Sequence, residues 1–167
     1  MNSLKSLPRA VVIALATLGV LAYAAAALVT FADVIGRNLG APIEGVVDLV
    51  QLFVVTGAWL VMPFAFQSAA HVGVDFVINM LPKSLAAPLR VFAAAVALVL
   101  VGLMLWYGFD TFKMRTMFGD RSQQLGIPIA WYWYPLLVGL AASLVGILVH
   151  LFDALKSEKS KKPEIHA

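Results

Sequence analysis

Four long apolar runs constrain this chain more than any other feature of its sequence. They cover Ala10–Ala32, Val46–Phe66, Leu89–Phe109 and Ile129–Phe152. Each is long enough to cross the hydrocarbon core of a bilayer, which takes roughly 20 apolar residues. Hydrophobic residues make up 62% of the chain and charged residues 13%, against about 45–50% and about 25% in soluble domains. We therefore predict an all-α integral membrane protein with four transmembrane helices.

Four spans leave no room for a second, soluble domain in 167 residues. We predict one four-helix transmembrane domain over residues 1–155. Residues 156–167 alternate Lys, Ser and Glu around one Pro, a composition that cannot bury a core and predicts a mobile cytoplasmic tail. The first run has 23 residues, more than the usual 7–15 of a signal peptide, so we expect it to be retained as a helix.

Basic residues predict the orientation in the membrane, because they favour the cytoplasmic side. A cytoplasmic N-terminus places eight of them inside: Lys5, Arg9, Lys83, Arg90, Lys156, Lys159, Lys161 and Lys162. It places four outside: Arg37, Lys113, Arg115 and Arg121. The Trp and Tyr residues at 106–107 and 131–134 then lie at the outer interface, where such rings prefer to lie. Both termini are predicted to be cytoplasmic.

The third helix is a candidate for extension beyond its apolar core. Phe109, Phe112, Met117 and Phe118 can share one helical face. A helix from about Leu85 to Phe118 would be about 50 Å long, so it would be tilted or would project from a core of ~30 Å. An interfacial loop after residue 109 is the alternative.

The second helix carries polar residues near its outer end. Glu44, Asp48 and Gln51 have spacings of four and three residues, which place them on one helical face. A carboxylate in the membrane costs free energy, so Asp48 should face protein or water. One hypothesis is an ion or proton site; the one we favour is a structural contact, with Arg37 of this chain or another as the partner.

A second polar group follows at the inner end of this helix. Gln67, His71 and Asp75 repeat the four-residue spacing, and His71 with Asp75 is predicted to be a structural or subunit-interface pair. Because His71 and His150 both fall near the cytoplasmic side, axial haem ligation by the two is an alternative. We expect no metal site and no cofactor in this chain, since one His–Asp pair does not make a metal site.

Several functional classes are excluded or disfavoured by what the sequence lacks. There is no cysteine, which excludes disulfides and thiol chemistry. There is no GxxxxGK[ST] phosphate loop, and no Ser/His/Asp set is placed for acyl transfer. The net charge of +3 is explained by basic residues at the ends of the runs and does not indicate nucleic-acid binding. We predict that the chain is not an enzyme.

Three stretches together resemble the small, DctQ-like membrane subunit of tripartite ATP-independent periplasmic (TRAP) transporters. They are DVIGRNLGAPIEGVVDLVQ (33–51), HVGVDFVINMLP (71–82) and SQQLGIPIAWYWYPLLVG (122–139). The resemblance covers nearly the whole chain, including its length and number of spans. Members often have aromatic residues after the Arg of the first stretch, whereas here Asn38 follows Arg37.

The resemblance implies a function and partners. In this family a periplasmic binding protein captures an organic anion, and a large membrane subunit imports it with sodium across the bacterial inner membrane. The small subunit supplies scaffold and docking surface and holds no substrate or sodium site. The candidate docking residues are Lys113, Arg115, Asp120 and Arg121. The alternatives are a membrane anchor of a haem- or quinone-binding redox complex and a homo-oligomeric channel or exporter.

Overall fold

The computed structural model describes residues 3–69 and 83–160 of the chain. In these residues it has four helices: α1 over Ser3–Asn38, α2 over Val46–Ala69, α4 over Lys83–Met117 and α5 over Ala130–Ser160. Each predicted apolar run coincides with one of them. Each helix contains a segment long and apolar enough to cross a membrane. The prediction of an all-α integral membrane protein with four transmembrane helices is confirmed.

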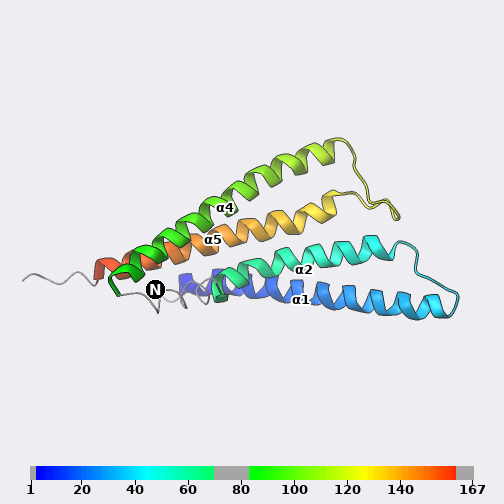
Figure 1. The fold of residues 1–167 in the computed structure, drawn as a ribbon, viewed down its shortest axis with the longest axis horizontal. Coiled ribbons are helices and arrows are strands. Elements are labelled where there is room, and N and C mark those ends of the chain that lie inside the picture. Colours follow the sequence, from blue (N-terminus) through cyan, green and yellow to red (C-terminus); the bar gives the residue numbers. More distant parts are fainter. Residues whose placement is uncertain (1–2, 70–82, 161–167) are drawn as a thin grey trace, which may run out of the picture.

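Helix α4 shows the predicted extension of the third span. It continues to Met117 without interruption, so residues 110–117 are helical and not an interfacial loop. Its 35 residues correspond to about 52 Å at 1.5 Å per residue. Figure 1 shows α4 inclined to α5, with the two helices moving apart toward the end of α4. A helix of this length must tilt in a core of about 30 Å or project from it.

The helices stand in an open row whose order is α1, α2, α5, α4 (Figure 1). Helix α5, the last in the sequence, packs between α2 and α4. Helices α1 and α4 form the two edges of the row. Large apolar side chains are exposed on both edges, among them Leu28, Phe31, Phe92 and Val99. Such exposure is stable in lipid, where apolar side chains have no water to avoid.

The core of the row lies where α2, α4 and α5 meet. Val101, Leu140 and Ile147 are buried there, with Trp59 and Leu98 packed around them. Small residues let the helices approach closely, as they commonly do in membranes. Gly139 of α5 lies directly against the backbone of Trp59, and Gly57 of α2 lies against the ring of Tyr23 in α1.

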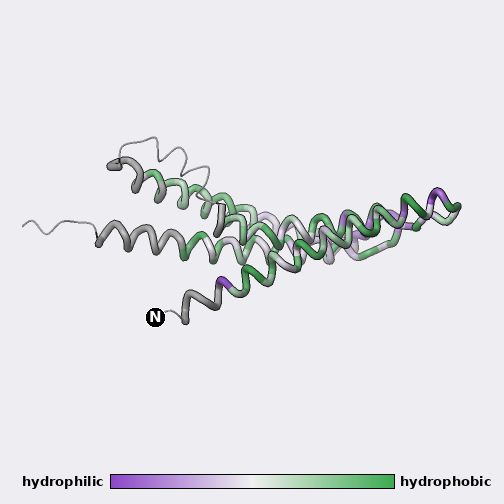
Figure 2. The backbone as a smooth tube through the Cα atoms, turned by 90° about the horizontal axis from the view of Figure 1, so that it is seen from below, coloured by the Kyte–Doolittle hydropathy of each residue, from purple (hydrophilic) through white to green (hydrophobic). Residues whose placement is uncertain are grey.

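Two connecting segments lie at the same end of the row, which we call the loop end. They are the α1–α2 loop, residues 39–45, and the α4–α5 loop, residues 118–129. The start of α1 and the end of α5 lie at the opposite end (Figure 1). Figure 2 shows most of the length of the row to be apolar, with hydrophilic residues gathered at the loop end. Which membrane side the loop end occupies stays a prediction.

Helix α5 also enters the segment that we predicted to be a tail. Residues 156–160 belong to this helix. Residues 161–167 lie outside the described part of the chain, so the mobility of the tail stays a prediction.

Candidate functional site

Asp48 is the centre of the candidate site at the loop end. It lies in the first turn of α2 and is only 4% exposed. Its Oδ2 atom accepts hydrogen bonds from the backbone N–H of Gln124, at 2.9 Å, and of Leu125, at 2.7 Å. These donors are 76 and 77 residues away in the sequence. The carboxylate therefore holds the α4–α5 loop against the start of α2.

The α4–α5 loop is folded so that these two N–H groups point together. The Ser122 N–H donates to the Ile127 carbonyl at 2.9 Å, and the Ile127 N–H donates back to Ser122 Oγ at 2.9 Å. Gly126 has a φ of 66°, a left-handed conformation that glycine adopts without steric cost. These bonds close a small turn around residues 123–126. The Ser122 side chain also lies beside the Asp48 carboxylate.

Gly45 makes the contact between the two loops possible. It has a φ of 72° and lies directly under the side chain of Leu125. A side chain at this position would overlap Leu125 and would also strain the backbone. Glycine at residue 45 thus allows Leu125 to approach and its N–H to reach Asp48.

Tyr132 joins a third element to the same residue. It lies at the start of α5, is 7% exposed, and donates its hydroxyl proton to the Asp48 carbonyl at 2.9 Å. Buried tyrosines usually find such a partner for the hydroxyl. Asp48 thus connects α2, the α4–α5 loop and α5 at one point, which we call the Asp48 junction.

Asp33 forms a comparable contact in the α1–α2 loop. It is 5% exposed near the end of α1. Its Oδ2 accepts from Arg37 Nε at 2.7 Å, and its Oδ1 accepts from the backbone N–H of Ile43 at 3.0 Å. The Ala41 N–H also donates to the Gly36 carbonyl at 2.8 Å. Together these bonds fold the loop back over the end of α1, an arrangement that we call the Asp33 turn.

Both carboxylates have the partners that burial requires. A buried charge is stable only when it is paired or hydrogen-bonded. Hydrogen bonds with one charged partner contribute about 1.5–3 kcal/mol each. Among the described residues, every buried side-chain nitrogen and oxygen has a hydrogen-bond partner. The arrangement therefore fixes the loop geometry, with Oδ2 of Asp48 accepting two backbone N–H groups.

The structure corrects the predicted partner of Asp48. Arg37 does not pair with Asp48 of the same chain; it pairs with Asp33, one turn earlier on α1. A partner from another chain stays a prediction. Residues four apart on a helix are neighbours, so this pair forms locally. The Arg37 side chain is 62% exposed, whereas that of Asp33 is 8% exposed.

The predicted polar face of Glu44, Asp48 and Gln51 is also corrected. Glu44 is exposed and lies in the turn before α2, and Gln51 is exposed on the helix. Only Asp48 is buried. Helical spacing does not apply to Glu44, because the left-handed Gly45 separates it from the first turn of α2.

The four candidate docking residues lie at the loop end. Lys113 and Arg115 are on the last turns of α4, and Asp120 and Arg121 are in the loop that follows. Arg115 and Asp120 form an ion pair at 3.5 Å. Arg121 donates to the Gly126 carbonyl at 3.1 Å. Lys113 lies over the Phe109 ring, 4.5 Å from its centroid.

His71 and Asp75, predicted to form a polar pair, lie outside the described residues. The same is true of the His150 side chain, so the haem hypothesis for these two histidines stays untested. Among the side chains that the structure describes, which exclude those of residues 150–160, no three His, Cys, Asp or Glu lie close enough together to hold a metal ion.

The sequence interpretation missed the importance of Asp33, Ser122 and Tyr132. Asp33 could have been found from its spacing to Arg37, since an acid and a base four residues apart commonly pair on a helix. Ser122 and Tyr132 gave no comparable signal. Their role depends on a contact between segments more than 70 residues apart in the sequence.

Comparison with known protein families identifies a transporter-component family. A family described as tripartite ATP-independent periplasmic transporters, DctQ component, matches residues 26–157. This range includes both loops, the Asp48 junction and the Asp33 turn. No curated protein matches the chain.

Proposed function

The chain belongs to the DctQ component family of tripartite ATP-independent periplasmic transporters, and from this premise we propose that it is the scaffold and docking subunit of such a transporter. It is a multi-pass membrane protein and a transporter component.

The proposed partners are a large membrane subunit and a periplasmic binding protein. The large subunit would import an organic acid coupled to sodium, across the bacterial inner membrane. The loop end would face the periplasm, which the count of eight basic residues against four supports. This chain would hold no substrate or sodium site of its own.

The observation that carries the proposal is the Asp48 junction. A docking surface binds more tightly when its loops are ordered before the partner arrives, because ordering costs free energy on binding. Asp48 holds the α4–α5 loop to α2 through two backbone hydrogen bonds of 2.9 and 2.7 Å. The charged side chains of this loop are thereby presented on a fixed surface.

The open row supports the scaffold part of the proposal. A row has two broad faces and two edges, and exposed apolar side chains occur on all four helices. A larger polytopic subunit can pack against such a surface without burying unpaired charge.

The docking role is tested by replacing Arg115 and Arg121 together with Ala. We expect weaker capture of the binding protein and slower uptake in proteoliposomes that contain all three subunits. Charged rims act mainly on the rate of encounter, so the loss should shrink as salt is raised.

The matched control replaces the same two residues with Lys. This variant keeps both charges but removes the guanidinium groups that contact Gly126 and Asp120. Normal docking in the Lys variant, with impaired docking in the Ala variant, would support an electrostatic role. Unchanged docking and uptake in the Ala variant would refute the assignment of these residues.

The redox-anchor alternative has a direct test. A visible absorption band from haem in the purified protein, lost in His71→Ala or His150→Ala, would favour it over the transporter proposal. Co-purification with a much larger polytopic subunit would instead contradict the homo-oligomeric channel. The family match favours the transporter over both.

A further inference from the structure

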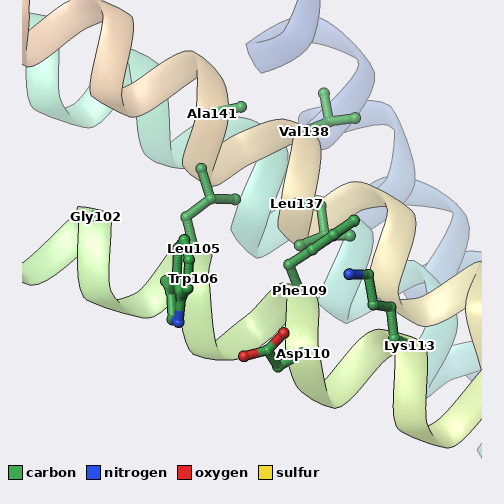
Figure 3. A pocket seen from close by; sticks show the side chains of 9 residues that line it. All are labelled: Gly102, Leu105, Trp106, Phe109, Asp110, Lys113, Leu137, Val138 and Ala141. Atoms are coloured by element: carbon green, nitrogen blue, oxygen red, sulfur yellow. The ribbon is translucent and has the colours of Figure 1, made fainter.

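A groove of about 620 Å³ opens between α4 and α5 near the loop end (Figure 3). Its walls are mainly apolar: Leu105 and Phe109 come from α4, and Leu137, Val138 and Ala141 come from α5. Its volume lies within the range of about 300–1,000 Å³ found for small-molecule sites. The groove arises because α4 moves away from α5 toward the end of α4 (Figure 1).

Two charged residues lie at one end of this groove. Asp110 and Lys113 line it from α4, and Figure 3 shows the Lys113 side chain turned back toward Phe109. Neither Asp110 nor Lys113 forms an ion pair with another described residue. The groove thus combines an apolar wall with one positive and one negative group.

The exposed aromatic residues place these charges at headgroup depth. Trp106, Trp131 and Tyr134 are 70%, 59% and 52% exposed. Exposed Trp and Tyr rings concentrate where the hydrocarbon core meets the headgroups. Phe112, adjacent to Lys113 in the sequence, has its ring centroid 5.7 Å from that of Tyr134. Lys113 and Asp110 therefore lie beside this aromatic layer, whereas Gly102 lies deeper in the apolar part of α4.

The length of the groove matches one leaflet of the bilayer. Gly102 and Lys113 both line it, and eleven residues of helix separate them by about 16 Å. Half of a ~30 Å hydrocarbon core is about 15 Å. A groove of about 620 Å³ has room for a hydrocarbon chain along its apolar wall.

We propose that this groove is a binding site for one phospholipid with a zwitterionic, amine-bearing headgroup. An acyl chain lies along Leu105, Leu137 and Ala141. The headgroup phosphate meets the Lys113 ammonium, and the headgroup ammonium meets the Asp110 carboxylate. An anionic lipid without an amine satisfies Lys113 but leaves Asp110 facing a negative charge. This site shares Lys113 with the candidate docking residues, but it requires neither the binding protein nor a transported solute, so lipid retention by the isolated chain tests it separately from docking.

The groove is tested by filling it. A Cβ atom added at Gly102 meets no heavy atom within 4 Å, so Gly102→Leu extends into the groove without forcing the backbone to move. The full-length chain, purified in mild detergent from phosphatidylethanolamine and phosphatidylglycerol membranes, is examined by native mass spectrometry. We expect one retained phosphatidylethanolamine in the wild type and its loss in Gly102→Leu.

The matched control is Val99→Phe. Val99 is 59% exposed on the same helix and does not line the groove. We expect this variant to retain lipid as the wild type does. Equal retention in the wild type and in Gly102→Leu would overturn the proposal.

The headgroup preference is tested with Asp110→Asn. We expect the wild type to retain phosphatidylethanolamine about two- to fivefold over phosphatidylglycerol, the range for one partly exposed ion pair. Asp110→Asn should lose this preference, and Lys113→Ala should weaken retention of both lipids. A wild type that prefers phosphatidylglycerol would overturn the headgroup assignment.

A protein occupant gives a different result. The chain has no cysteine, so Gly102→Cys provides a single labelling site. A lipid-soluble maleimide should label it equally in the isolated chain and in the chain co-purified with a large membrane subunit. Labelling that is blocked only by the large subunit would overturn the lipid proposal and identify a protein in the groove.

Discussion

The Asp48 junction and the Asp33 turn are both built on an aspartate carboxylate, but their partners lie at very different distances along the sequence. Each buries a carboxylate that accepts backbone N–H bonds from a loop. Asp33 bonds a loop residue ten positions away and has Arg37 as an ionic partner. The backbone donors to the Asp48 carboxylate lie 76 and 77 positions away, and the Ser122 side chain lies beside it. The Asp33 turn organises one helix end, whereas the Asp48 junction connects two halves of the chain.

Replacing Asp48 should have the largest effect on stability of all the changes at these two contacts. In Asp48→Ala, two N–H groups lose their acceptor, and each unsatisfied buried group costs about 1–3 kcal/mol. We expect a loss of about 2–5 kcal/mol in unfolding free energy. The released α4–α5 loop should also be cut faster by trypsin after Arg121. Thermal unfolding in detergent and the cleavage rate provide the measurements.

Asp48→Asn serves as the control, since its amide oxygen still accepts hydrogen bonds but carries no charge. We expect roughly half of the loss seen with Ala, because bonds to charged groups are about twice as strong as neutral ones. Trypsin cleavage of Asp48→Ala at the wild-type rate would show that the loop is held by something else.

The second comparison uses two glycines: Gly40 lies in the Asp33 turn, and Gly45 lies beside the Asp48 junction. Gly40 and Gly45 have φ values of 76° and 72°, so alanine at either position costs about 1–2 kcal/mol of backbone strain. Only Gly45 lies under Leu125, whereas a Cβ at Gly40 meets nothing within 4 Å. We therefore expect Gly45→Ala to lower the unfolding midpoint more than Gly40→Ala.

Adding Leu125→Ala to Gly45→Ala isolates the steric part of the effect. The smaller side chain should remove the overlap, so the double variant should lose less than the sum of the two single variants. Strict additivity would mean that Leu125 moves aside freely, and it would argue against a fixed contact between the loops.

The smallest effect is expected for Arg37→Ala. Exposed ion pairs contribute about 0–1 kcal/mol, and the Arg37 side chain is 62% exposed. Asp33→Ala should destabilise the protein more, by about 1–3 kcal/mol, because the Ile43 N–H also loses its acceptor. Thermal unfolding of the two variants measures the difference. A larger loss of unfolding free energy in Arg37→Ala than in Asp33→Ala would contradict the conclusion that the bond from Ile43 to Asp33 stabilises the turn more than the Arg37 ion pair does.

The helices themselves could be predicted from the sequence because the membrane imposes a simple length and composition rule. The runs that begin at Val46 and Ile129 differ from the starts of α2 and α5 by at most one residue. The extension of α4 to Met117 was indicated by apolar spacing, although a loop was an open alternative. Such patterns could be interpreted because apolar spacing depends only on residues within a few turns of the same helix.

The partners of Asp48 could not be predicted by the same means. Spacing along α2 identified Asp48 as a residue that needs a partner, but it gave no information on which distant segment supplies it. The nearest cation in the sequence, Arg37, was therefore the wrong choice. The actual donors are backbone N–H groups, which every residue except proline carries, so no residue type marks them.

The position of α5 in the row sets an order for assembly during synthesis. Chains emerge from the N-terminus, so α1 and α2 can pair, and the Asp33 turn can close, before later helices exist. Asp48 enters the membrane without Gln124, Leu125 or Tyr132, which are made more than 70 residues later. Helix α5 then completes the row between α2 and α4. A chain that stops after α4 lacks Gln124 and Leu125, so its Asp48 carboxylate has no loop donors in the membrane. Such an incomplete chain is less stable than the full one, because a buried charge without partners costs free energy.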